Sequence, residues 1–268
     1  MTEKIERLAE LVRHTPAAHH PSARAVGRNA FTRAVDHVLL WIRHRVPPLH
    51  WLGAALSGLA LYIYACLAGK TSRIVAAGAR KWPDIPERSV LAIWHDSAPS
   101  LLAAIASRKP PARLVILIAT EPRGDSLHIL CRLLGMRVVR GDWGHRGWPS
   151  VAHLAELAAG GACVLITPDG GGPRRTARAG ALVLAAAAGV PLIAIGADCH
   201  PALSEPHKWD QPRNPPPFCR IAISIQPPLD FADFENAAAL ESARLQLEQA
   251  LNEAHSQARR ELGLSKPE

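Results

Sequence analysis

Aromatic residues make up only 5% of the 268-residue sequence, and no stretch interleaves them with basic residues. Proteins that bind single-stranded nucleic acid stack bases on such side chains, so this class of function is disfavoured. The chain is nevertheless basic, with 31 Lys and Arg residues against 23 Asp and Glu and a formal net charge of +8. Basic proteins favour anionic partners, and here lipid head groups or phosphorylated small molecules fit better than nucleic acid.

Cysteines are few and scattered, and none of the five forms a CxxC pair. Neither a disulfide framework nor a zinc site is therefore predicted, and no metal is expected. Cys131 and Cys163 lie within apolar runs and are expected to be small core residues. A reducing, cytosol-facing location follows from this cysteine usage. The first residues, MTEKIERLAELVRH, also lack the basic-then-apolar order of a secretory signal.

Charged residues are absent from 51–69, WLGAALSGLALYIYACLAG, and basic residues flank this run on both sides. Its length reaches the lower range for a helix that spans a bilayer of about 30 Å. Tyr62 and Tyr64 lie in the middle of the run, not at its ends, and the flanking charges give no orientation. Two interpretations remain: a membrane-associated segment, whether spanning, re-entrant or interfacial, or a buried core helix. The length favours membrane contact.

From residue 88 onward, apolar runs alternate with helix-like stretches. Strands are expected at 88–94, 113–119, 136–140, 162–168, 190–196 and 219–226, the last at an edge of the sheet, and helices at 97–107, 125–134, 147–159, 177–188 and 235–260. Strands and helices in alternation predict an α/β fold with a mostly parallel sheet flanked by helices. The Pro- and His-rich segment 198–217 is expected to hold no strand of its own.

This pattern divides the chain into three expected parts. Residues 1–48 form an N-terminal helical and basic arm, with helices at 2–14 and 30–45 joined by a linker. Residues 49–75 form the apolar, membrane-associated segment, and residues 76–268 form the α/β domain. The fold is thus an α/β domain preceded by an apolar helical segment.

Polar residues follow several of the expected strands. His95 and Asp96 come after the first strand, Asp125 after the second and Arg140 at the end of the third. Because ligands of α/β sheets bind beyond the carboxyl ends of the strands, these groups should converge at one edge. A neutral imidazole with an ordinary pKa of about 6.5 suits His95 to take a proton from an alcohol. The alternatives are a structural His95 and an Asp96 that caps the following helix.

A glycine-rich segment, PDGGGPRR (168–175), follows the fourth expected strand. Consecutive glycines let backbone amides approach a ligand, and the two arginines behind them can grip a phosphate through paired hydrogen bonds. The segment has neither the Gly-Lys-Ser/Thr ending of a Walker loop nor the dinucleotide fingerprint. The alternative is a surface turn with solvated arginines. The expected phosphate- or substrate-binding residues are Arg140, Asp169, Gly170, Gly171, Arg174 and Arg175.

Over about residues 50–230 the chain resembles the lysophospholipid acyltransferase superfamily, and within it the bacterial group called domain of unknown function 374. The matching blocks are AIWHDS, RGDS, LGMRVVRGDW, TPDGGGPRRTARAG, AGVPLIAIG and KWDQPRNPPPFCRIAI. Each block alone is weak, and it is their order and spacing that make the resemblance specific.

The resemblance implies an acyltransferase at the cytoplasmic face of a bacterial inner membrane. His95 would activate the hydroxyl of a (lyso)lipid for attack on an acyl thioester, with acyl-CoA or acyl carrier protein as donor and no resident cofactor. In the wider superfamily an acid five residues later orients this histidine, but here that residue is Ser100. Asp125 and Asp96 are the candidate replacements, with Asp169 next. Relatives bind the acceptor phosphate with a Glu-Gly-Thr-Arg block, whose place the glycine segment takes here.

Two functions of other classes remain open. The first is a non-catalytic phospholipid-binding protein that keeps the fold, which the missing acid at Ser100 favours. The second is a nucleotide- or sugar-phosphate-binding protein, favoured by the glycine segment alone and opposed by the apolar run. For an acyltransferase, backbone amides of the helix that begins near Ser97 are the expected donors to the oxyanion.

Overall fold

A computed structural model describes residues 2–15, 30–78, 85–108, 113–141, 147–229, 231 and 233–264 of the chain. The expected linker between the first two helices lies almost entirely outside these residues. The helices are α1 (Thr2–Arg13), α3 (Ala30–Arg45), α4 (Pro47–Thr71), α5 (Ala98–Ser107), α6 (Pro122–Leu133), α7 (Trp148–Ala159), α8 (Gly180–Ala188) and α9 (Ala237–Glu261), with a short 3-10 turn, η3, at His95–Ser97.

A seven-stranded sheet in the order β1-β9-β6-β2-β5-β3-β4 forms the centre of the fold. Its strands are β1 (Arg73–Ala77), β2 (Ser89–Ile93), β3 (Leu114–Ile118), β4 (Arg137–Arg140), β5 (Cys163–Ile166), β6 (Leu192–His200) and β9 (Arg220–Ile225). All neighbours are parallel except β6 and β9, which are antiparallel. Apolar runs such as LVILI and CVLI form strands buried on both faces, as parallel sheets require. The expected mostly parallel α/β fold is confirmed.

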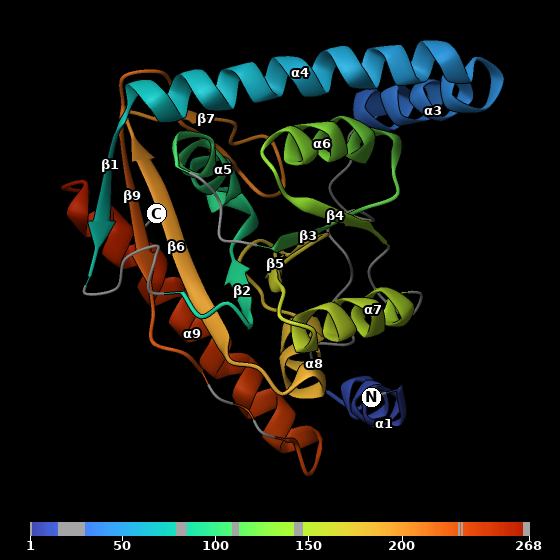
Figure 1. Ribbon diagram of the computed structural model, residues 1–268, viewed down its shortest axis with the longest axis vertical. Coiled ribbons are helices and arrows are strands. Elements are labelled where there is room, and N and C mark those ends of the chain that lie inside the picture. Colours follow the sequence, from blue (N-terminus) through green and yellow to red (C-terminus); the bar gives the residue numbers. More distant parts are fainter. Residues whose placement is uncertain are drawn as a thin grey trace.

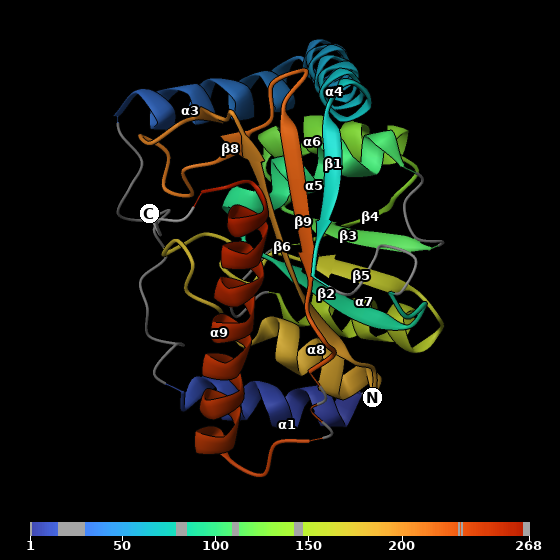
Figure 2. The same cartoon turned by 90° about the vertical axis from the view of Figure 1, so that its left-hand side faces the viewer.

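Helices cover both faces of the sheet (Figures 1 and 2). One face packs against α5 and α6, and α4 lies across the outer side of these two helices. The other face packs against α7, α8 and α9, and α1 joins this layer at its outer end. Ile5 and Leu8 of α1 are buried in the same core as Leu154 and Leu182. The first helix is therefore part of the core and not a free arm.

The long helix α4 is apolar on all sides, and small residues seat it on the domain. One narrow stripe is buried, namely His50, Ala54, Gly58, Ala65, Ala68 and Gly69. A Cβ atom at Gly69 would lie 1.9 Å from the carbonyl oxygen of Ala103 in α5, so glycine permits this close approach. The other side of α4 is exposed, with Leu52 and Leu56 accessible to 57% and 60%. The helix is long and apolar enough to cross a membrane, by length and composition alone.

Three features of the sheet differ from the sequence expectation. The strand expected at an edge, β9, lies between β6 and β1. The strand at this edge is β1, which follows α4 after a single residue. The expected boundary between the apolar segment and the α/β domain, at 75/76, therefore falls inside β1. Segment 198–217 was expected to hold no strand, but it contains the end of β6 and the hairpin β7 (Leu203–Ser204) and β8 (Arg213–Asn214). The extra length of β6 has a physical cause, since β9 pairs with its second half.

Candidate active site

Two loops meet at the carboxyl edge of the sheet, because β2 and β5 are adjacent parallel strands. His95 follows β2, and the glycine segment follows β5. Asp169 joins the loops: its two carboxylate oxygens accept hydrogen bonds from the backbone N–H groups of His95 (3.1 Å) and Arg175 (3.2 Å). Burial raises the pKa of Asp169 to about 7, although the Arg175 amide opposes the change. The expected proximity of His95 and Asp169 is therefore found, through the backbone of His95 and not its ring.

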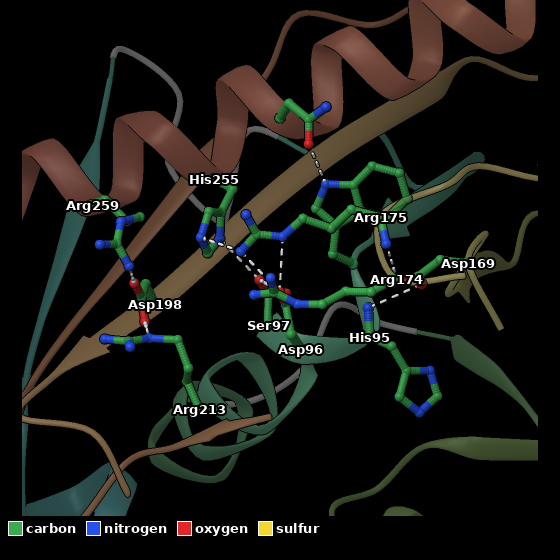
Figure 3. Close-up of polar contacts among 12 residues, drawn as sticks. His95, Asp96, Ser97, Asp169, Arg174, Arg175, Asp198, Arg213, His255 and Arg259 are labelled. Carbon is green, nitrogen blue, oxygen red and sulfur yellow. Dashed lines mark hydrogen bonds and ion pairs between the residues drawn. The ribbon is translucent and has the colours of Figure 1, made fainter. Parts of the chain in front are cut away.

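The His95 side chain points away from the interior and is 40% exposed (Figure 3). Its Nδ1 atom lies 3.3 Å from Oγ1 of Thr167 at the end of β5. Its Nε2 atom lies 3.9 Å from Oδ2 of Asp210, and its ring centroid is 5.2 Å from that of Trp209. The imidazole is thus held by its backbone and flanked by polar groups, yet it remains accessible from solvent. Access to the ring is one condition that a general base must meet.

Asp96 points in the opposite direction, into a buried cluster. Its Oδ2 atom lies 2.8 Å from guanidinium nitrogens of both Arg174 and Arg175, and its Oδ1 accepts the Ser97 hydroxyl at 3.0 Å. The residue is only 1% exposed. Neither of the roles weighed for Asp96, partner of the His95 ring or helix cap, matches these contacts. The carboxylate instead balances the charge of two arginines.

His255 of α9 closes this cluster from a distant part of the chain (Figure 3). Its Nε2 lies 2.7 Å from a terminal nitrogen of Arg175, and its Nδ1 lies 3.1 Å from the Ser97 hydroxyl. An arginine only donates, so Nε2 must accept and Nδ1 must carry the proton. Burial, with Arg175 beside it, lowers the pKa of His255 to about 4 and keeps the ring neutral. Sequence reasoning missed this residue, and nothing in its local pattern marks it.

The glycine segment is folded inward, unlike the open phosphate cradle that we expected. Gly170 and Gly171 are buried, and the Gly170 amide donates to the carbonyl of Thr167. The guanidinium groups of Arg174 and Arg175 face Asp96, and their side chains are 21% and 19% exposed. Arg175 also has a left-handed backbone with a φ of 54°, which costs free energy and is held by its bonds to Asp169 and Asp96. These arginines therefore stabilise the loop.

Asp125, one of the two candidate acids for orienting His95, makes its contacts with other residues. One carboxylate oxygen lies 2.8 Å from Nε2 of His50 in α4, and the other lies 2.8 Å from Arg140 at the end of β4. Arg43 of α3 is 3.8 Å away. Asp125 stands in the first turn of α6, from which its side chain points toward α4 and not along the sheet edge. It therefore holds α4 to the domain, and the direct pairing with His95 is not what these contacts show.

A basic cavity of about 220 Å³ lies above this carboxylate, lined by Arg43, Trp51, Thr120, Asp125, His128 and Arg140. Burial, with Arg140 beside it, lowers the pKa of His128 and keeps this ring neutral at pH 7. Two arginines against one carboxylate leave the cavity with a net positive charge. Arg140, one of the expected substrate-binding residues, thus lines this cavity. The Ser97 amide, an expected oxyanion donor, is bonded to the carbonyl of Trp94.

The described part of the chain offers no cluster of metal-ligating side chains. There, no group of three or more His, Cys, Asp or Glu side chains is placed to hold a metal ion.

Known structures include a distant likeness to this chain. The crystal structure of the 1-acyl-sn-glycerophosphate (LPA) acyltransferase PlsC from Thermotoga maritima is similar with a TM-score of 0.44 and 14% sequence identity. The likeness covers 81% of this chain and 93% of that chain. No protein-family model matches the chain, and no curated protein matches it.

Proposed function

We propose that the chain is an acyltransferase that moves a fatty acyl group from acyl-CoA or acyl carrier protein to the hydroxyl of a (lyso)lipid at a membrane, with His95 as general base. The observation that carries this proposal is the His95 geometry. Its amide is bonded to the buried Asp169, while its ring is 40% exposed at the carboxyl edge of the sheet. The sequence blocks that resemble the lysophospholipid acyltransferase superfamily supply the reaction class.

The proposed reaction needs one proton transfer in each direction. His95 takes the proton of the acceptor hydroxyl as that oxygen attacks the thioester carbonyl. The tetrahedral intermediate then collapses, the C–S bond breaks, and the imidazolium returns the proton to the leaving thiolate. The products are an ester and a free thiol, so no redox partner is needed.

The anionic part of a substrate is assigned to the basic cavity. Arg174 and Arg175, which were also expected to bind the phosphate, are left out of this assignment because their guanidinium groups face Asp96. Arg140 keeps its expected role because it lines the cavity. β2, β5, β3 and β4 are successive neighbours, so three strand spacings of about 4.8 Å separate the ends of β2 and β4, roughly 14 Å. The cavity would thus hold an anionic group remote from the reacting oxygen, such as a distal head-group phosphate or a phosphate of the donor.

Membrane attachment is assigned to α4, at the cytoplasmic face of a bacterial inner membrane. The buried stripe of small residues runs along the helix, which at 25 residues is roughly 37 Å long. Such packing fits a helix lying in the interface, with one side on the protein and the leucine side in lipid, better than a helix surrounded by lipid. Arg45 and Lys70 at its ends are exposed, and each basic residue near an anionic surface adds about 1 kcal/mol.

A non-catalytic phospholipid-binding protein is the second candidate. Ser100, which stands where relatives carry the orienting acid, is fully buried in α5 and supplies no carboxylate. If the site only binds lipid, the cavity and α4 would keep their roles and His95 would have none.

Mass spectrometry of products separates these two functions. Purified protein is incubated with acyl-CoA and a mixed lipid extract, and new acylated lipids are identified. We expect His95→Ala to abolish the product while thermal unfolding stays unchanged. The control is His153→Ala in α7, a similarly exposed histidine with a 48% accessible side chain. Turnover by His95→Ala that equals the control would reject the mechanism.

Vesicle sedimentation tests the attachment. Replacing both Leu52 and Leu56 by Asp should release the protein from vesicles that contain anionic phospholipid, because both side chains would leave the apolar interface. Leu245→Asp is the matched control, since Leu245 is 50% exposed but lies on α9. Deleting residues 1–70 is a poorer test, because it also removes Ile5 and Leu8 from the core. Equal binding of both variants would rule out α4 as the docking face.

A further inference from the structure

The segment between β6 and β9 returns over the carboxyl edge and brings two side chains to His95. The ring of Trp209 packs against the imidazole, with 5.2 Å between the ring centroids and an angle of 48° between the ring planes. The carboxylate of Asp210, whose side chain is 14% exposed, lies 3.9 Å from Nε2 of His95. Both residues belong to the turn between β7 and β8, which are paired across Leu203 and Asn214.

This turn is fixed to the domain by charged contacts. Arg213 of β8 donates to Oδ1 of the buried Asp198 at 2.6 Å, and Arg259 of α9 donates to Oδ2 at 3.1 Å (Figure 3). Within the hairpin, Glu205 pairs with Lys208 at 2.7 Å and accepts from the Asn214 amide at 3.0 Å. The position of Asp210 relative to His95 is therefore set by the fold.

We infer that Asp210, seated by Trp209, is a positioning residue for His95: its carboxylate holds the Nε2–H side of the imidazole and stabilises the imidazolium. Nδ1, beside the Thr167 hydroxyl, is then the nitrogen that takes the proton. No residue near position 100 has to supply this acid. The kinetic part of this inference rests on the proposed function, whereas the electrostatic part does not.

The charges around His95 support this assignment. Asp169 approaches the backbone amide of His95, and Asp96 with both arginines of the glycine segment lies on the inner side of the loop. Asp210 is a carboxylate on the ring side, facing Nε2. An opposite charge within about 4–6 Å favours the protonated form of a histidine. At 3.9 Å the contact is an ion pair longer than a hydrogen bond, so charge and orientation carry the effect.

NMR titration tests the inference without any reaction. Full-length protein in detergent is labelled with ¹³C and ¹⁵N histidine, and the His95 signals are identified by their loss in His95→Ala. We expect Asp210→Asn to lower the titration midpoint of His95 by about 1 pH unit. Asp210→Glu should recover part of that shift. Glu253→Gln, which removes an exposed carboxylate of α9 paired with Arg260, is the control and should leave the midpoint unchanged. A His95 midpoint that does not move in Asp210→Asn overturns the inference.

Kinetics then separate this inference from the proposed function. If the protein transfers acyl groups, Asp210→Asn should lower kcat by about 10- to 100-fold with little change in KM, and should move the acidic limb of the pH profile. A shifted midpoint in a protein without transferase activity would keep the positioning role and reject the function. Transferase activity in the wild type, with a His95 midpoint that is the same in Asp210→Asn, would keep the function and reject the positioning role. Equal thermal unfolding of wild type and Asp210→Asn shows that the fold is intact.

Discussion

Replacing Gly69 with alanine should loosen α4 from the domain. The added Cβ atom would lie 1.9 Å from the carbonyl oxygen and 2.9 Å from the carbonyl carbon of Ala103. Both are backbone atoms of α5, which cannot rotate away as a side chain can, so the two helices must separate. Gly53 offers the matched control, because among the described residues nothing lies within 4 Å of its added Cβ. Both glycines are in the same helix, and only Gly69 is at the contact.

Two effects of opposite sign set the magnitude. An alanine in place of a helical glycine stabilises the fold by about 1 kcal/mol, whereas overpacking costs about 1–3 kcal/mol. Gly53→Ala should therefore raise the free energy of unfolding by about 1 kcal/mol. Gly69→Ala, with its severe overlap, should lower it by about 2 kcal/mol. Urea denaturation followed by circular dichroism measures both, and equal stability of the two variants would refute the close packing of α4 on α5.

Three further outcomes follow from buried groups. Asp125→Ala should lower the free energy of unfolding by about 3 kcal/mol, measured in urea, because the buried His50 and the partly buried Arg140 lose their carboxylate. Burial raises the pKa of Asp169 from 3.8 to about 7, so its contribution to stability is full below about pH 4 and is lost as pH rises through 7. The melting temperature of wild type relative to Asp169→Asn should accordingly fall between pH 4 and 7, and a constant difference would contradict the burial. Burial also raises the pKa of Cys131 to about 12 and of Cys163 to about 11, so iodoacetamide at pH 8 should label them only in denaturant, as mass spectrometry can show.

Local patterns in the sequence determine the α/β fold and the edge at which the site forms. Apolar runs such as LVILI can be buried on both faces only in a covered sheet. The helices between these runs connect one strand to the next as crossovers, which favours parallel strands. Because parallel strands end at the same edge, the sequence also predicts that His95 and the segment of Asp169 reach one edge. That they are neighbours there depends on the pairing of β2 with β5, which the strand order of the sheet decides. The fold class and the shared edge are consequences of the alternation of strands and helices along the chain, which can be read from the sequence.

Side-chain partners and distant contributions were decided by the tertiary structure. Asp125 turns to His50 because α4 lies over α6, and Asp96 turns inward because α9 brings His255 beneath the loop. Asp210 reaches His95 because β6 extends past its neighbours and pairs with β9, so that the following hairpin returns over the edge. Each of these contacts joins residues more than 70 positions apart. Spacing along the chain fixes which edge a residue reaches, whereas the packing of helices around the sheet fixes which side chain it meets there.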